Sequence, residues 1–308
     1  MFTKRTDLAI EAHELWQESA GKTTRLAGVR ATEKKIQGYP VTRVDILDQE
    51  GEAALGKPAG SYRTLDLTAF WQRGDGFFDR AVRAVGQQVK ELTPDSGPVL
   101  VVGLGNRAMT PDAVGPLAAD SILITRHLID AMPQHFSGFR PVAALRPGVL
   151  GTTGVESAEA VRGLVDRLHP SAVIAVDALA ARSSKRIAST IQIADTGITP
   201  GSGVGNHRKA LDRETLGVPV VAVGVPLVVY ASTIAADALC ALGEGEVEEE
   251  RIAACVQRVV SEKLGEMIVT PREVDALVER MAGVLADGIN QALHPRLSRD
   301  EIAQMMAQ

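Results

Sequence analysis

The chain contains very little cysteine, since only Cys240 and Cys255 occur among its 308 residues. Both lie in segments with helical periodicity, so we expect buried thiols in a reducing compartment rather than a disulfide framework. No CxxC motif and no cluster of cysteine with histidine is present, which argues against a structural zinc site. The length is nevertheless sufficient to bury a large apolar core.

Long apolar runs and an excess of basic charge are also missing. No stretch is long enough to cross a bilayer, and Met1–Asp7 lacks the apolar core of a secretory signal. The net charge of −5 argues against direct nucleic-acid binding. We therefore expect a cytoplasmic protein that has neither a membrane nor a nucleic acid as a direct partner.

The apolar and charged residues, 45% and 23% of the chain, follow an alternating pattern of strands and helices. Such alternation predicts an α/β fold whose parallel strands are joined by right-handed crossovers. The pattern predicts strands at 41–47, 61–67, 99–102, 141–146, 172–177, 187–194 and 218–225, and helices at 77–92, 111–132, 155–168, 232–242, 251–263 and 270–293. We expect the first two strands to form an antiparallel extension, residues 28–39 to be a charged connection, and strand 187–194 to lie near an edge.

The segment Val99–Asp112 is the stretch around which the predicted sheet is organised. Its first four residues are apolar and mostly β-branched, as in a strand buried on both faces. Thr110 is a suitable N-cap for a helix that begins at Pro111. Asp112 would then lie at the carboxyl end of a central strand, which is the edge of a parallel sheet where ligands bind.

Asp177 also follows an apolar strand, and it forms the second half of a candidate catalytic pair with Asp112. If the strands run in the order 2-1-3, the first and third are neighbours and both carboxylates face one crevice. Two close carboxylates favour retention of one proton. One could then activate a water while the other protonates or orients a carbonyl. The alternative is that both aspartates are ordinary helix caps.

Two glycine-containing loops could line a substrate-binding site or stabilise an oxyanion. The alternative for the second loop is that it is only a flexible connection. The candidate residues in them are Gly103, Gly105, Asn106, Gly201, Ser202 and Gly203. The first loop resembles a relaxed dinucleotide motif, but Pro111 delays the helix that such a site requires. The second loop lacks the GxSxG pattern of a serine hydrolase. Asp195-Thr-Gly matches aspartic proteases in only three residues, and we interpret Asp195 as a turn cap.

Several long segments resemble the germination proteases of spore-forming bacteria. The matching segments are Arg5–Ala12, Val101–Asn106, Thr110–Pro116, Leu123–Leu128, Pro147–Glu156, Ala175–Arg182, Thr190–Ile198, Pro200–Asn206, Glu214–Pro219 and Met267–Asp275. They span most of the chain. Departures from the family pattern are a short leader, an abbreviated segment Gly243–Glu266, and Leu227 and Tyr230 in place of threonine and aspartate.

The resemblance implies an endopeptidase that degrades small acid-soluble spore proteins during germination. It also implies a homotetrameric zymogen in the spore core whose catalytic pair matches Asp112 and Asp177. We expect no cofactor and name no metal ligand. The implied fold is similar to hydrogenase maturation proteases: a three-layer α/β sandwich around a mostly parallel sheet, with an N-terminal β extension. We thus expect a single peptidase domain over residues 8–308, in which residues 8–92 form the extension and residues 93–294 the core.

The N-terminus has the pattern that the family cleaves, an acidic residue followed by Leu-Ala-x-Glu. The resemblance therefore implies self-cleavage between Asp7 and Leu8, with residues 1–7 as a candidate propeptide that keeps the enzyme inactive. Two alternatives stay open. The same carboxylates could hold a metal ion in a metal-dependent or maturation-type protease, or the first glycine loop could belong to a nucleotide-binding module without enzymatic activity.

Overall fold

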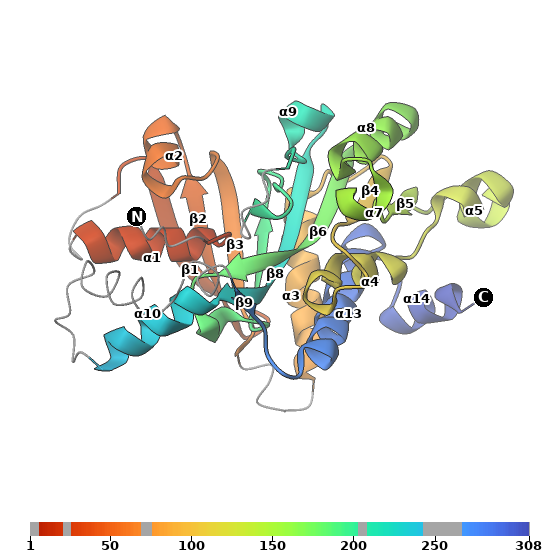
Figure 1. Cartoon of the computed structure of the whole chain (residues 1–308). Coiled ribbons are helices and arrows are strands. Elements are labelled where there is room, and N and C mark those ends of the chain that lie inside the picture. The colour runs from red at the N-terminus through yellow and green to blue at the C-terminus, as the bar shows by residue number, and fades with distance from the viewer. Residues whose placement is uncertain (1–5, 21–25, 69–75, 203–207, 243–266, 308) are drawn as a thin grey trace.

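The computed structural model describes residues 6–20, 26–68, 76–202, 208–242 and 267–307 (Figure 1). Its strands are β1 (Val29–Ile36), β2 (Tyr39–Ile46), β3 (Gly60–Asp66), β4 (Val99–Gly103), β5 (Val142–Leu145), β6 (Ala172–Ala181), β7 (Thr190–Ala194), β8 (Val220–Tyr230) and β9 (Ile268–Val269). Its helices are α1 (Ala9–Ala20), α2 (Gln49–Leu55), α3 (Phe77–Leu92), α4 (Val114–Asp120), α5 (Arg126–Ala131), α6 (Pro133–Phe136), α7 (Leu150–Thr153), α8 (Ser157–Leu168), α9 (Arg213–Leu216), α10 (Ala231–Leu242), α13 (Val274–Leu293) and α14 (Arg299–Met306). None of these helices is both long and apolar enough to cross a membrane.

All the described strands belong to one sheet with the order β1-β2-β3-β7-β8-β6-β4-β5, and β9 pairs with β8. In this spatial order, neighbouring strands in the part β8-β6-β4-β5 are parallel. Neighbouring strands in the part β1-β2-β3-β7-β8 are antiparallel. The first parallel strand along the chain, β4, lies between the second and the third, so the condition that we set for a facing pair of aspartates, the order 2-1-3, is met. This order brings the carboxyl end of β4 beside the middle of β6.

Helices cover both faces of the parallel half of the sheet (Figure 1). Val99 and Val101 of β4 point into a core shared with α3 and α13, while Leu100 and Val102 point into a second core shared with α8. Because successive side chains of a strand face opposite sides, a strand buried on both faces needs an uninterrupted apolar run. The α/β sandwich with its β extension is thus confirmed, although more of the sheet is antiparallel than we expected.

Two predictions about the antiparallel half were wrong. Residues 29–36 form β1 instead of a charged connection, because their charged side chains lie on an exposed edge strand where no apolar alternation is needed. Residues 190–194 form β7, which is fully buried between β3 and β8 and does not lie near an edge. The strand that we expected to be marginal therefore connects the extension to the parallel core.

Several element boundaries also differ from the prediction. The helix expected at 111–132 is divided into a short 3-10 turn, α4 and α5. It is interrupted because the Leu123 N–H donates to Asn290 and the Thr125 N–H donates to the Val142 carbonyl, so this backbone is bound to other elements. The strand expected to end at Asp177 continues to Ala181, since β8 pairs with it over that length. The helix expected at 251–263 lies outside the described residues.

Candidate active site

Asp112 is held in a 3-10 turn that follows β4 and precedes α4. One of its carboxylate oxygens, Oδ2, accepts a hydrogen bond of 2.8 Å from the Asn106 N–H. Gly105 has a φ of +111°, and a Cβ there would lie 2.1 Å from the Asp112 carbonyl oxygen. Only glycine allows this close approach. The sequence motif between Gly103 and Asp112 therefore folds the loop back onto the aspartate.

Asp177 lies within β6, where the neighbouring strand β4 has just ended. The preceding residue, Val176, pairs with Gly103, which is the last residue of β4, and Asp177 itself pairs with Gly224 of β8. Its side chain is buried, and its Oδ1 accepts a hydrogen bond of 2.9 Å from the Ala178 N–H. The end of β4 thus leaves an opening beside a buried carboxyl group.

Both aspartates line a cavity of about 180 Å³. Asp7, Gly105 and Gly201 are among its other lining residues. Neither aspartate caps a helix through its side chain, because the carboxylates bond to Asn106 and Ala178 and not to the first turn of a helix. The geometry therefore favours the paired-carboxylate interpretation over the alternative of two helix caps.

The pKa values of the two carboxyl groups are both raised, but to different extents. Burial raises the pKa of Asp112, while the Asn106 hydrogen bond and the positive charge of Arg208 lower it. Burial raises the pKa of Asp177 well above its ordinary value, and the negative charges of Asp112 and Asp7 raise it further. Asp177 therefore retains a proton to a higher pH than Asp112 does, so the pair holds an acid and a base together.

Arg208 completes the charged groups of this cavity, and it is not among the site residues predicted from the sequence. It lines the cavity, and its Nη1 atom is buried without a hydrogen-bond partner. The same atom lies 4.0 Å from Glu156, at the limit of an ion pair. No motif distinguishes this arginine in the sequence.

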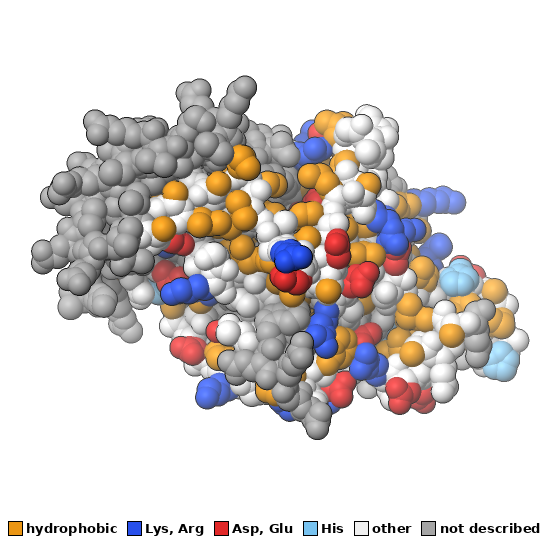
Figure 2. Space-filling model, turned by 60° about the horizontal axis from the view of Figure 1, so that its bottom comes forward, with side chains coloured by type: hydrophobic (Ala, Val, Ile, Leu, Met, Phe, Trp, Pro, Cys, Tyr) orange, Lys and Arg blue, Asp and Glu red, His pale blue; other side chains and the backbone are white. Residues whose placement is uncertain are grey.

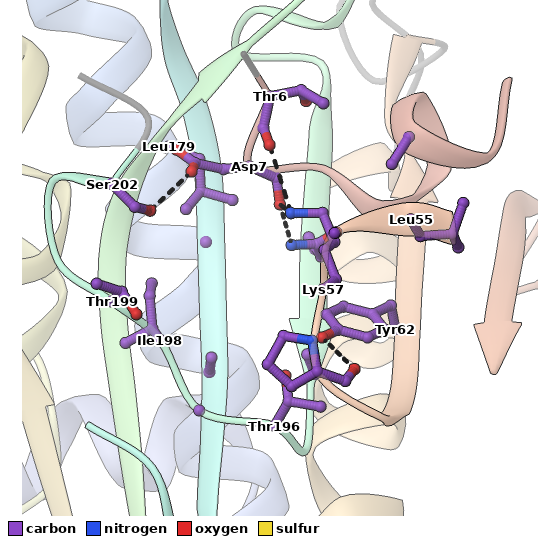
Figure 3. A pocket seen from close by; sticks show the side chains of 18 of the residues that line it. Thr6, Asp7, Leu55, Lys57, Tyr62, Leu179, Thr196, Ile198, Thr199 and Ser202 are labelled. Atoms are coloured by element: carbon purple, nitrogen blue, oxygen red, sulfur yellow. Dashed lines mark hydrogen bonds between the residues drawn. The ribbon is translucent and has the colours of Figure 1, made fainter. Parts of the chain in front are cut away.

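The predicted cleavage site lies at the same cavity and also lines a larger one. Asp7 borders both the cavity of the aspartates and a neighbouring cavity of about 740 Å³ (Figure 3). Leu8 is fully buried against Leu179 and Ala181. The N-terminal segment is therefore anchored beside the two aspartates.

The predicted glycine loops have different roles in the structure. Gly201 lines the cavity of the aspartates, while the hydroxyl of Ser202 donates a hydrogen bond to Asp7 from the neighbouring cavity. Gly103 lets α4 approach closely, because a Cβ there would lie 2.3 Å from the Gly115 carbonyl oxygen. The N–H of Asn106 is already bound to Asp112. Gly203 lies outside the described residues.

The metal-binding alternative and the three-residue match to aspartic proteases receive no support from the structure. Within the described ranges, no three histidine, cysteine, aspartate or glutamate side chains are grouped so that they could hold a metal ion. The Asp195 carboxylate accepts a hydrogen bond from the Ser61 N–H of β3, and so it connects two strands. On the described part of the face in Figure 2, acidic and basic side chains are interspersed with apolar ones, and no continuous basic surface forms there.

Comparison with known proteins matches most of this chain to one sequence family. The sequence profile described as "Germination protease" matches residues 9–243 and 241–306. The chain belongs to the germination protease family. This membership places it among proteases, in agreement with the resemblance seen in the sequence.

Curated germination proteases match nearly the full chain. The protein of Clostridium perfringens (strain ATCC 13124) is 39% identical and covers 99% of this chain and 100% of its own length. That of Caldanaerobacter subterraneus subsp. tengcongensis is 41% identical, with 98% coverage of both chains. Among solved structures, a [NiFe] hydrogenase maturation protease HycI from Thermococcus kodakarensis KOD1 aligns with 66% of this chain and 98% of its own, at 19% identity and a TM-score of 0.35.

Proposed function

We propose that this germination protease is a self-processing endopeptidase in which Asp112 and Asp177 activate a water molecule for peptide hydrolysis. The observation that carries the proposal is the pair of carboxyl groups in one cavity, with the buried one under the negative charge of the other. Such a pair supplies an acid and a base without any cofactor.

The different surroundings of the two aspartates assign their roles. Asp112 is the general base, because the Asn106 N–H and the charge of Arg208 favour its ionised form. Asp177 is the general acid, because burial and the charge of Asp112 keep its proton bound. Asp112 takes a proton from the water that attacks the scissile carbonyl, and Asp177 orients that carbonyl or protonates the departing nitrogen.

The substrates that we propose are small acid-soluble spore proteins, and the first bond cut is the chain's own Asp7–Leu8 bond. Support comes from family membership and from the position of Asp7 at the cavity of the aspartates. Residues 1–7 would then be a propeptide that occupies the site until it is cleaved. We further propose that the enzyme acts as a homotetramer in the spore core, as an attribute of the family.

Mass spectrometry of the N-terminus tests the proposal directly. After incubation at mildly acidic pH, we expect the unmodified chain to acquire a new terminus at Leu8. We expect the Asp112→Asn variant to process at least about 100-fold more slowly, since a positioned general base contributes that much or more. A spore-protein substrate added to each sample measures cleavage of a second chain. Near-normal processing by Asp112→Asn would remove this residue from the mechanism.

A further inference from the structure

The N-terminal segment is bound to β6 through its backbone as well as its side chain. The Asp7 N–H donates a hydrogen bond of 3.1 Å to the Ala180 carbonyl, and the Ala180 N–H donates one of 2.8 Å to the Asp7 carboxylate. The hydroxyl of Ser202 binds the other carboxylate oxygen at 2.9 Å. These contacts fix Asp7 in one orientation, beside the bulge that shifts the register of β6 after Leu179.

The carbonyl oxygen of Asp7 receives two further hydrogen bonds from side chains of the antiparallel half. Lys57 Nζ donates at 3.1 Å, and Gln192 Nε2 donates at 3.0 Å. Lys57 also makes a longer contact of 3.4 Å with the Thr6 carbonyl. Figure 3 shows Lys57 and Ser202 approaching Asp7 from opposite sides of the pocket. Two donors thus converge on the carbonyl of the Asp7–Leu8 peptide bond.

Gln192 binds the backbone on both sides of Leu8. While its Nε2 donates to the Asp7 carbonyl, its Oε1 accepts a hydrogen bond of 2.7 Å from the Ala9 N–H. Its position in the buried strand β7 leaves the amide little freedom. One side chain therefore spans the backbone on either side of Leu8, whose own side chain is fully buried.

Four residues after Asp7, Glu11 provides a second anchor for the segment. Its carboxylate accepts hydrogen bonds from the Arg182 N–H at 2.7 Å and the Ser183 N–H at 3.0 Å. The guanidinium of Arg186 lies 3.4 Å away. Asp7 is bound to the end of β6, and Glu11 is bound to the loop that follows it. The peptide bond between Asp7 and Leu8 is therefore held at one position relative to β6.

We propose that Lys57 and Gln192 form the oxyanion-binding site of this protease, which holds the carbonyl oxygen of the peptide bond that is cut. The inference rests on the proposed function, because it takes Asp7–Leu8 as a scissile bond. It adds two catalytic residues that neither the sequence motifs nor the pair of aspartates revealed. It also moves the oxyanion site from the predicted glycine loops to the antiparallel half of the sheet.

The chemistry requires donors at this oxygen. When the water oxygen bonds to the Asp7 carbonyl carbon, the carbonyl electron pair moves to oxygen and gives a tetrahedral oxyanion, while Asp112 takes the water proton. Collapse restores the carbonyl and breaks the bond to the Leu8 nitrogen, which takes a proton from Asp177. The products are a new main-chain carboxyl group on Asp7 and a new main-chain amino group on Leu8. Donors already directed at the oxygen stabilise the charge without having to reorganise.

The surroundings of Lys57 suit it to this role. Burial lowers the pKa of Lys57, while the charges of Asp7 and Glu11 raise it. A cation removed from water interacts more strongly with a developing negative charge than an exposed one does. Gln192 supplies a neutral donor in a fixed position, so the two side chains combine charge with orientation.

The decisive measurement is the first-order rate at which the full chain acquires its Leu8 terminus. We expect Lys57→Met and Gln192→Leu each to slow this step about 100-fold or more, as loss of one oxyanion donor does in other proteases. Lys57→Arg, which keeps a cationic donor, should recover part of the rate. Lys90→Met is the matched control, because Lys90 lies exposed on α3, and it should process at the unmodified rate.

Hydrogen exchange separates catalysis from docking of the segment. In an Asp112→Asn background that leaves the segment attached, Lys57→Met should leave the protection of the Leu8 and Ala9 amides within about threefold of the background. Protection lost in parallel with the cleavage rate would show that Lys57 serves only to anchor the segment, and would overturn the inference.

The remaining outcomes distinguish the inference from the function on which it rests. Normal processing by Lys57→Met, with Asp112→Asn inactive, would overturn the oxyanion site alone and leave the protease mechanism intact. Absence of a Leu8 terminus from the unmodified chain would overturn both, because the bond held by Lys57 and Gln192 would then not be a substrate.

Discussion

The parallel and antiparallel halves of the sheet contribute to the site in different ways. The parallel half supplies Asp112, which follows the carboxyl end of β4, and Asp177, which lies within β6 where β4 has ended. The antiparallel half supplies Gln192 from β7 and Lys57 from the turn before β3. Sheet topology therefore locates the two carboxyl groups that we propose as the acid and the base, whereas the positions of Lys57 and Gln192 depend on side-chain packing.

The substitution with the largest expected effect on the cleavage rate replaces an aspartate of the parallel half, and its control replaces one of the antiparallel half. Asp177→Asn should reduce peptide cleavage by about 100-fold to 10,000-fold, because asparagine cannot transfer the proton. Asp195→Asn, in the antiparallel half, should leave the rate within about threefold, since its oxygen can still accept the hydrogen bond from Ser61. Initial rates on a spore-protein substrate measure both variants. Equal losses would mean that the two halves are not divided as proposed.

The sequence allowed the central strands and the pair of aspartates to be predicted for physical reasons, whereas the 2-1-3 strand order was only a condition of that hypothesis. An apolar run such as Val99–Val102 has one stable environment, a strand buried on both faces, and a polar loop that follows such a strand begins at the carboxyl edge of the sheet. Lys57 and Gln192 gave no comparable signal. Gln192 is a single polar residue between Ile191 and Ile193, and we interpreted this alternation as an edge strand although the strand is central.

The limits of the fold prediction have the same origin. Strand β1 was missed because exposed edge strands carry no apolar period, and the helix predicted from Pro111 was too long because its interruption depends on Asn290 of α13, far along the chain. Both are decided by contacts between distant segments. Local patterns therefore predicted the elements of the core better than the positions where the core meets the rest of the molecule.

The buried carboxyl group of Asp177 links the stability of the fold to pH. The pKa of Asp177 is raised in the folded state, so the folded chain binds its proton more tightly than the unfolded chain does. Stability from this group is complete below the unfolded pKa and is lost as pH rises through the folded one. Asp177→Asn should therefore raise the melting temperature relative to the unmodified chain, and by more at pH 7 than at pH 4.

Thermal unfolding of both chains across this pH range provides the measurement. A difference for Asp177→Asn that stayed constant with pH would show that the carboxyl group is not protonated preferentially in the folded state. In that case its role as the general acid could not stand.

The smallest expected effect concerns β1, which is the outer edge of the antiparallel half. Arg30 pairs with Asp45 at 3.0 Å, but its side chain is 62% exposed and Asp45 keeps a second partner in Arg43. Exposed ion pairs contribute about 0 to 1 kcal/mol, so Arg30→Ala should change the unfolding free energy by no more than about 1 kcal/mol. Denaturant titration, with cleavage assayed in parallel, measures both stability and activity. A larger loss of stability, or any loss of cleavage, would mean that the edge of the extension supports the positions of Lys57 and Gln192. The two halves of the sheet would then act as one unit, and the proposed division into a catalytic core and a substrate-orienting extension would be wrong.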